Sequence, residues 1–209
     1  MEKNDVVYSA AVGATAIGIY AYGGLPQFRY TGNWGGNYRI QNELVSELRI
    51  VPLATQALML STLGVVSFSK NERWPLAVMA LQSFSNTYIL TQLAKSTFGR
   101  ERPYFVGQPI GDASYGDHRS FWSASSALSG TASGLLWAFS SHENTSPFMR
   151  KTFRGLSLAS TATVMFSRVY AGQHHISDVV VGASIGFLIG YFTPRMYAIP
   201  GGMGISLGN

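Results

Sequence analysis

Six apolar stretches of about twenty residues constrain the fold of this chain more than any other feature. They cover residues 6–24, 51–69, 74–94, 121–141, 152–171 and 176–194. About twenty apolar residues are what a helix needs to cross a bilayer, and runs of this length are too long for strands. Charged residues make up 12% of the chain, whereas an average soluble domain has roughly 25%. The sequence therefore predicts an all-α fold, a six-helix bundle that we expect to be transmembrane.

Several of these stretches are polar for a lipid-facing helix. Residues 74–94 include Gln82, Asn86 and Gln92, and residues 121–141 are rich in Ser, Ala and Gly. Small residues let helix backbones approach closely inside a bundle, so we interpret this content as helix–helix packing. A soluble helical bundle is the alternative. No internal repeat or domain boundary is visible, so we expect one helical domain over residues 1–209.

The basic residues between Lys95 and Pro103 cluster where a long apolar helix is expected to end. Interfacial Lys and Arg side chains often lie with their stems along apolar surface and their charges in water. The same cluster would also suit an anion-binding site. This segment alone leaves both interpretations open.

His174 and Asp178 are four residues apart at the expected start of the last helix, which places them on one helical face. A carboxylate there can hold one imidazole nitrogen and leave the other available as nucleophile or base. His175 has Val179 four residues on and no such partner, so His174 is the better candidate. A His–Asp pair with a purely structural role is the alternative.

Small hydroxyl residues open the helix expected near Phe121, in the segment 120–127, which reads Ser-Phe-Trp-Ser-Ala-Ser-Ser-Ala. Backbone N–H groups and hydroxyls at a helix start can bind an anion. A helix cap followed by a packing face is the alternative.

Taken together, the three segments resemble the type 2 phosphatidic acid phosphatase superfamily, which also includes bacterial acid phosphatases and vanadium haloperoxidases. The family's first motif is Lys, six residues, then Arg-Pro, and Lys95, Arg102 and Pro103 match it. Its third motif is Ser-Arg, five residues, His, three residues, Asp. Four residues match that motif, namely Ser167, Arg168, His174 and Asp178. The motif-bearing core runs from about residue 95 to residue 186.

The family's middle motif, Pro-Ser-Gly-His, is the main departure. Residues 122–125 are Trp-Ser-Ala-Ser, so only Ser123 is kept, and Ser125 occupies the position of the family's general acid. A serine cannot act as an acid near neutral pH, so the resemblance implies phosphate binding with slow turnover. His118 is a less favoured substitute for this acid, because it is expected on the preceding loop.

The resemblance implies a role for each matching residue. Lys95, Arg102 and Arg168 would bind phosphoryl oxygens, and Ser123 with the Ala124 N–H would add hydrogen bonds. His174 would attack phosphorus to form a phosphohistidine, and Asp178 would orient it. This scheme requires no metal and no cofactor.

The expected function is hydrolysis of a membrane lipid phosphate or pyrophosphate, with a phospholipid or polyprenyl phosphate as substrate. The net charge of +5 favours anionic partners, and the absence of a dense Lys/Arg stripe argues against nucleic acid. The alternatives are a catalytically inactive phosphate- or phospholipid-binding relative and a soluble periplasmic acid phosphatase. A haloperoxidase is less favoured, because nothing selects vanadate over phosphate.

The expected location is the cell (inner) membrane, as a multi-pass protein, and the alternative is the periplasm. The N-terminus has no net positive charge, so residues 6–24 are interpreted as the first helix and not as a removed leader. The distribution of Lys and Arg between alternate loops, with the three basic site residues set aside, mildly favours cytoplasmic termini. The site would then face the extracytoplasmic side. The sequence makes no prediction of oligomeric state.

Overall fold

The computed structural model of the chain describes residues 3–26, 51–52, 57, 70–109, 114–141 and 145–197. The regular elements of this part are all helices, so the all-α class is confirmed. They are α1 (Lys3–Ala21), α3 (Lys70–Phe98), α4 (Ala124–Ser140), α5 (Pro147–Tyr170) and α6 (Ile176–Met196). The predicted stretch over residues 51–69 lies almost wholly outside the described residues, so a sixth helix stays a prediction.

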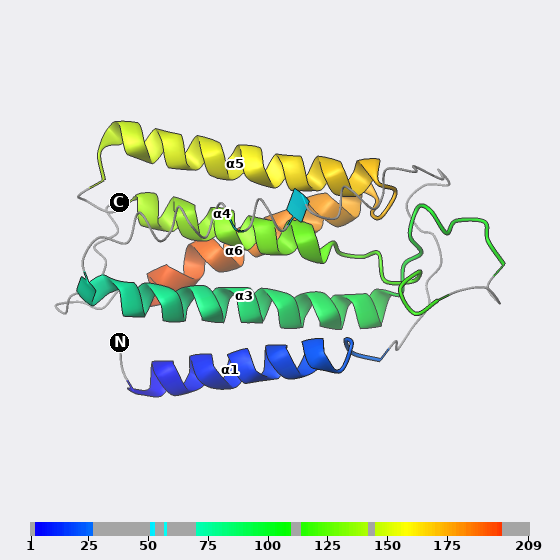
Figure 1. Cartoon of the computed structure of the whole chain (residues 1–209), viewed down its shortest axis with the longest axis horizontal. Helices are drawn as coiled ribbons and strands as arrows, with labels where there is room; N and C mark the ends of the chain where they lie inside the picture. Colours follow the sequence, from blue (N-terminus) through cyan, green and yellow to red (C-terminus); the bar gives the residue numbers. More distant parts are fainter. Residues whose placement is uncertain are drawn as a thin grey trace.

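The five helices run broadly along one axis, and α6 crosses behind α4 (Figure 1). Helix α4 packs against α3, α5 and α6, whereas α1 packs on α3. The C-terminal ends of α3 and α5 meet the N-terminal ends of α4 and α6 at one end of the bundle, on the right of Figure 1. This end carries all three segments to which the sequence assigned chemistry.

Glycines set the distance between α4 and α6. A β-carbon added at Gly186 would lie 1.9 Å from the Ala127 carbonyl oxygen, and one at Gly130 would lie 2.2 Å from the Ala183 carbonyl oxygen. No side chain fits into such gaps, so the two backbones are in direct contact at these positions. The close packing that the small residues of α4 predict is therefore confirmed.

Hydroxyl side chains in the interior bond across helices. Thr87 of α3 lies 2.8 Å from Thr131 of α4 between their hydroxyl oxygens. Ser133 of α4 lies 2.7 Å from Thr161 of α5 in the same way. These pairs satisfy buried polar groups that would otherwise destabilise an apolar interior.

The helix ends differ from the apolar stretches by a few residues, because caps and not hydropathy determine them. Helix α5 begins at Pro147, five residues before the predicted start, since the Ser146 hydroxyl accepts the Met149 N–H at 3.3 Å. Glycines with positive φ follow the ends of both α3 and α5: Gly99 at 55° comes directly after α3, and Gly172 at 66° comes after Ala171, the C-cap of α5. Only glycine adopts this conformation readily, so both residues turn the chain into the site.

The outer surfaces of α1, α5 and α6 carry many large apolar side chains. Among the described helices, only α6 is long and apolar enough by length and composition to cross a membrane, and α1 is apolar but shorter. Exposed apolar residues nevertheless occur along all three helices, including Val7, Ile17, Phe148, Leu158, Phe166, Leu188 and Phe192.

Candidate active site

The turn over residues 114–120, between α3 and α4, holds three of the predicted site residues through its backbone carbonyls. Lys95 donates from Nζ to the Arg119 carbonyl at 2.5 Å. Arg102 donates from Nε to the Gly116 carbonyl at 2.9 Å. The Nδ1 atom of His174 lies 2.8 Å from the carbonyl oxygen of Ser120. The structure thus brings together Lys95, Arg102 and His174, although the chain separates the first from the last by almost eighty residues.

His174 precedes α6 and is not part of it, which corrects the prediction that His174 and Asp178 share a helical face. His175 is the N-cap, and Asp178 lies in the first turn of the helix. The Nδ1 atom of His174 lies 3.8 Å from the Asp178 carboxylate, which is too long for a hydrogen bond. The Ser120 carbonyl therefore orients the ring directly, and Asp178 acts on it as a nearby charge.

The contact with Ser120 determines which nitrogen of His174 carries the proton. A carbonyl oxygen can only accept, so Nδ1 is the donor, and in the neutral ring the lone pair is on Nε2. Burial lowers the pKa of His174 to about 3, and the charges of Lys95 and Arg102 add to this fall while the Asp178 carboxylate opposes it. His174 is therefore neutral near physiological pH, with an available lone pair on Nε2.

Asp178 is completely buried, and its oxygens accept several hydrogen bonds. Arg100 donates to Oδ1 at 2.5 Å, and the Ser120 hydroxyl donates to Oδ2 at 2.5 Å. The backbone N–H of His175 donates to Oδ2 at 2.9 Å. Asp178 thus joins the start of α6, the turn before α4 and the segment after α3.

Arg100 is one of the residues whose role sequence reasoning missed. It is completely buried, and beside its bond to Asp178 it donates to the Ser177 hydroxyl at 2.7 Å. Its presence in the basic cluster between Lys95 and Pro103 was the available signal. A buried guanidinium needs a buried anion, but the sequence alone did not indicate which acidic residue would provide it.

Gln173 holds the guanidinium of Arg102 from a second side. Its Oε1 atom accepts the Arg102 Nη1–H at 2.5 Å. Burial lowers the pKa of Arg102, and the nearby charges of Asp117 and Asp178 offset part of that change. Gln173 was not predicted, although it directly precedes the candidate nucleophile.

The N-terminus of α4 lies against the start of α6. Ser123 is the N-cap, its hydroxyl accepts the Ser126 N–H at 3.4 Å, and its own N–H donates to the Asp178 carbonyl at 3.1 Å. Ala124 and Ser125 form the first turn of the helix. The capping role that the sequence left open for this segment is confirmed for Ser123. Its predicted phosphate contact, and that of the Ala124 N–H, stay predictions.

Two further residues have defined positions. Arg168 is buried in the last turn of α5, where its carbonyl accepts the Gln173 N–H at 3.1 Å. His118 lies in the turn before α4, as predicted, with its ring packed edge-to-face on Phe105 at 5.5 Å between centroids. Within the described ranges, no three acidic or histidine side chains cluster as a metal site would require.

A family model described as the PAP2 superfamily matches residues 74–199, which is more than half of the chain. The chain belongs to the PAP2 superfamily. The match includes every site residue named above, and membership supports a phosphatase function at the level of the family. It also extends beyond the motif-bearing core predicted over residues 95–186.

The chain is also similar to a lipid A 4'-phosphatase from Porphyromonas gingivalis. The two are 35% identical over 50 residues, which cover 24% of this chain and 21% of that protein. The similarity thus spans about a fifth of the relative's length. No solved structure matches the chain significantly.

Proposed function

We propose that this protein hydrolyses a lipid phosphate or pyrophosphate through a covalent intermediate on His174. The observation that carries the proposal is the state of His174: neutral, held at Nδ1 by the Ser120 carbonyl, and close to two cationic side chains. A neutral imidazole whose Nε2 lone pair is available is a competent nucleophile.

In the proposed reaction, Nε2 of His174 attacks phosphorus and the bond from phosphorus to the leaving oxygen breaks. Lys95, Arg102 and Arg168 would bind the phosphoryl oxygens, and their charge would stabilise the transition state. The N-terminus of α4, with Ser123 and the Ala124 N–H, would add hydrogen bonds and a favourable helix dipole. Water would then attack the phosphohistidine, releasing phosphate and restoring the neutral ring.

Ser125 limits this reaction, because the leaving oxygen must receive a proton as its bond to phosphorus breaks. Ser125 lies in the first turn of α4, where the family places its general acid, but a hydroxyl group does not donate a proton near neutral pH. General acid catalysis contributes roughly 10²–10⁴-fold to the rate. We therefore expect turnover to be slower by about that factor than it would be with a histidine at position 125. A non-catalytic phosphate- or phospholipid-binding relative is the second candidate, and the same residue favours it.

A lipid substrate and a multi-pass membrane location are part of the proposal. The exposed apolar side chains on α1, α5 and α6 support them, because a lipid bilayer would remove these side chains from water. The relative's name, lipid A 4'-phosphatase, supports them as well. We expect the site to face the extracytoplasmic side. If the protein stays in the aqueous phase without detergent, a soluble periplasmic acid phosphatase replaces this assignment.

The test is a phosphate-release assay on three proteins: the natural chain, Ser125→His and His174→Ala. The substrates are phosphatidate, a polyprenyl pyrophosphate, lipid A and a water-soluble phosphate monoester. We expect slow release by the natural chain, faster release by Ser125→His and none by His174→Ala. Acid-labile phosphate on the Ser125→His protein would report the phosphohistidine.

Other outcomes separate the candidates. Vanadate or phosphate binding without turnover in the natural chain and in Ser125→His would favour the non-catalytic relative. Fast turnover by the natural chain would show that another group supplies the proton. Turnover by His174→Ala would refute the assignment of the nucleophile.

A further inference from the structure

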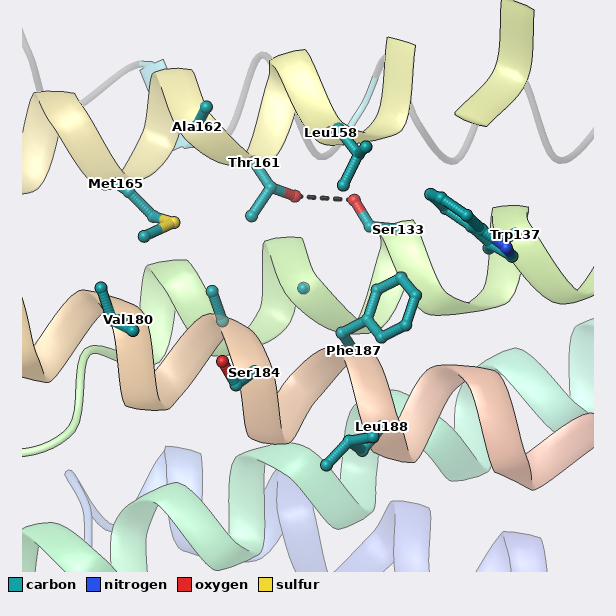
Figure 2. Close-up of a pocket in the computed structure, with 12 residues that line it drawn as sticks. Ser133, Trp137, Leu158, Thr161, Ala162, Met165, Val180, Ser184, Phe187 and Leu188 are labelled. Carbon is teal, nitrogen blue, oxygen red and sulfur yellow. Dashed lines mark hydrogen bonds between the residues drawn. The ribbon is translucent and has the colours of Figure 1, made fainter. Parts of the chain in front are cut away.

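A groove of about 650 Å³ opens between α5 and α6, with α4 as its floor (Figure 2). This volume is within the roughly 300–1,000 Å³ typical of small-molecule sites. Leu158 and Met165 reach into it from α5, and Val180 and Phe187 reach into it from α6. The groove is open toward the outside, because Leu158 and Val180 are about half exposed.

The buried inner surface of the groove, where α4, α5 and α6 meet, is apolar in effect. Gly130 and Ala183 contribute no polar side chain, and both are buried. The Ser133 and Thr161 hydroxyls bond to each other at 2.7 Å (Figure 2). Their hydrogen-bonding capacity is therefore largely used within the protein, and the groove suits a hydrocarbon ligand.

One end of the groove is close to the candidate active site. Met165 precedes Arg168 by three residues, so the two share a face of α5 and are about 5 Å apart along its axis. Val180 is about 3 Å along the α6 axis from Asp178 but on another face of that helix, so the groove approaches the site on the Arg168 side. The opposite end is near Trp137, whose ring packs edge-to-face on Phe187 at 5.7 Å between centroids. Phe187 is about 14 Å along the axis from Asp178. The groove thus extends away from the cationic site along the bundle.

From this arrangement we propose that the groove binds the hydrocarbon chain of the phosphate-bearing substrate while the phosphate lies at Lys95, Arg102 and Arg168. The inference rests on the proposed function. The site and the groove together match the two parts of one amphiphile, an anionic head and an apolar chain of more than ten ångströms. Chain recognition by α5 and α6 would be separate from the chemistry, because no groove residue bonds to His174 or Asp178 in the described part of the chain.

The first test measures binding, so that slow turnover does not affect it. Affinities of dodecyl phosphate and of inorganic phosphate are measured for the natural protein, Leu158→Trp and Val180→Trp in lipid nanodiscs. The two substitutions fill the groove from opposite walls. Ala159→Trp is the matched control, because Ala159 is exposed on α5 and does not line the groove.

We expect the natural protein to bind dodecyl phosphate more tightly than inorganic phosphate. Each groove-filling variant should reduce that ratio by about tenfold or more, as expected when roughly two methylene groups lose their contacts. Ala159→Trp should keep the ratio of the natural protein. An unchanged ratio in both groove variants would overturn the inference. Absence of binding of either phosphate would instead refute the proposed function.

A second test identifies the occupant without relying on bulky variants. A dodecyl phosphate with a photoreactive chain should label peptides that contain Leu158 or Phe187, and a phosphate-free analogue should label them several-fold less. Equal labelling by both probes would mean that any bilayer lipid fills the groove, which contradicts the inference. The chain has no cysteine, so oxidation of Leu158→Cys to a disulfide-linked dimer would indicate that a second copy occupies the groove, which would also overturn it.

Discussion

Removal of the Arg100 side-chain charge tests how the site is held together. Arg100 and Asp178 form an ion pair at 2.5 Å, and both side chains are completely buried. Arg100→Met keeps much of the side-chain volume but leaves the carboxylate without its cation. The Ser120 hydroxyl and the His175 N–H would remain as its hydrogen-bond donors.

The expected loss is large, because breaking a buried pair by removing one partner costs about 3–5 kcal/mol. In a chain of this length each kcal/mol shifts the melting temperature by roughly 2–4 °C, so Arg100→Met should melt about 6–20 °C lower. The double variant Arg100→Met/Asp178→Asn removes both charges. It should be less destabilised than the sum of the two single variants, because neither ion is then left alone.

The assay is thermal unfolding of the purified protein followed by tryptophan fluorescence, under one detergent condition for all variants. Lys151→Met is the control, because Lys151 is an exposed cation on α5 and such substitutions usually change stability by less than about 0.5 kcal/mol. A melting temperature for Arg100→Met within about 2 °C of the control would refute the reasoning. Strict additivity in the double variant would show that the two side chains do not act as a pair.

Three further outcomes follow from the packing and charges. Gly186→Ala should lower the free energy of unfolding by about 1–3 kcal/mol, because the added methyl group would overlap a carbonyl of α4. Gly155→Ala is the control, since an added β-carbon there has no atom within 4 Å, and chemical unfolding of both variants compares them. The pKa of His174 is about 3, below its ordinary value of 6.5, so the unfolded state binds the proton first and stability should fall as pH drops from 6.5 toward 3. Unfolding measured across that range should show a shallower fall for His174→Gln, and an identical fall would contradict the assignment. Gln173→Leu should weaken phosphate binding several-fold by releasing Arg102, and calorimetric titration that finds an unchanged affinity would argue against this positioning role.

The helices could be predicted from the sequence, but their ends could not. Apolar length indicates that a segment must be buried in protein or lipid, and a helix is the structure that satisfies its backbone there. Caps decide where the helix begins. Ser123 caps α4, which begins at Ala124, three residues after the predicted start, and Ser146 caps α5, which begins at Pro147, five residues before the predicted one. Hydropathy does not detect such local hydrogen bonds.

The motifs identified the residues of the candidate site without their mutual geometry. Lys95, Arg102 and His174 are predictable because their spacing is a family pattern, and the structure brings them together on one turn. Ser120 begins the hydroxyl-rich segment 120–127, but its two contacts, from its carbonyl to His174 and from its hydroxyl to Asp178, were not predicted. Every residue has a backbone carbonyl, so the residue type does not indicate which carbonyl will accept a hydrogen bond from His174.

The sequence by itself determined the all-α class, the membership in the PAP2 superfamily and the presence of a serine at position 125, since each depends on residue type and spacing along the chain. Only the tertiary structure decided that Asp178 pairs with Arg100, 78 residues away, and that His174 is held by a carbonyl 54 residues away. The physical reason is that a buried charge or imidazole takes whichever partner the packed helices bring within about 3 Å. The separation of those partners along the chain carries no information about that distance.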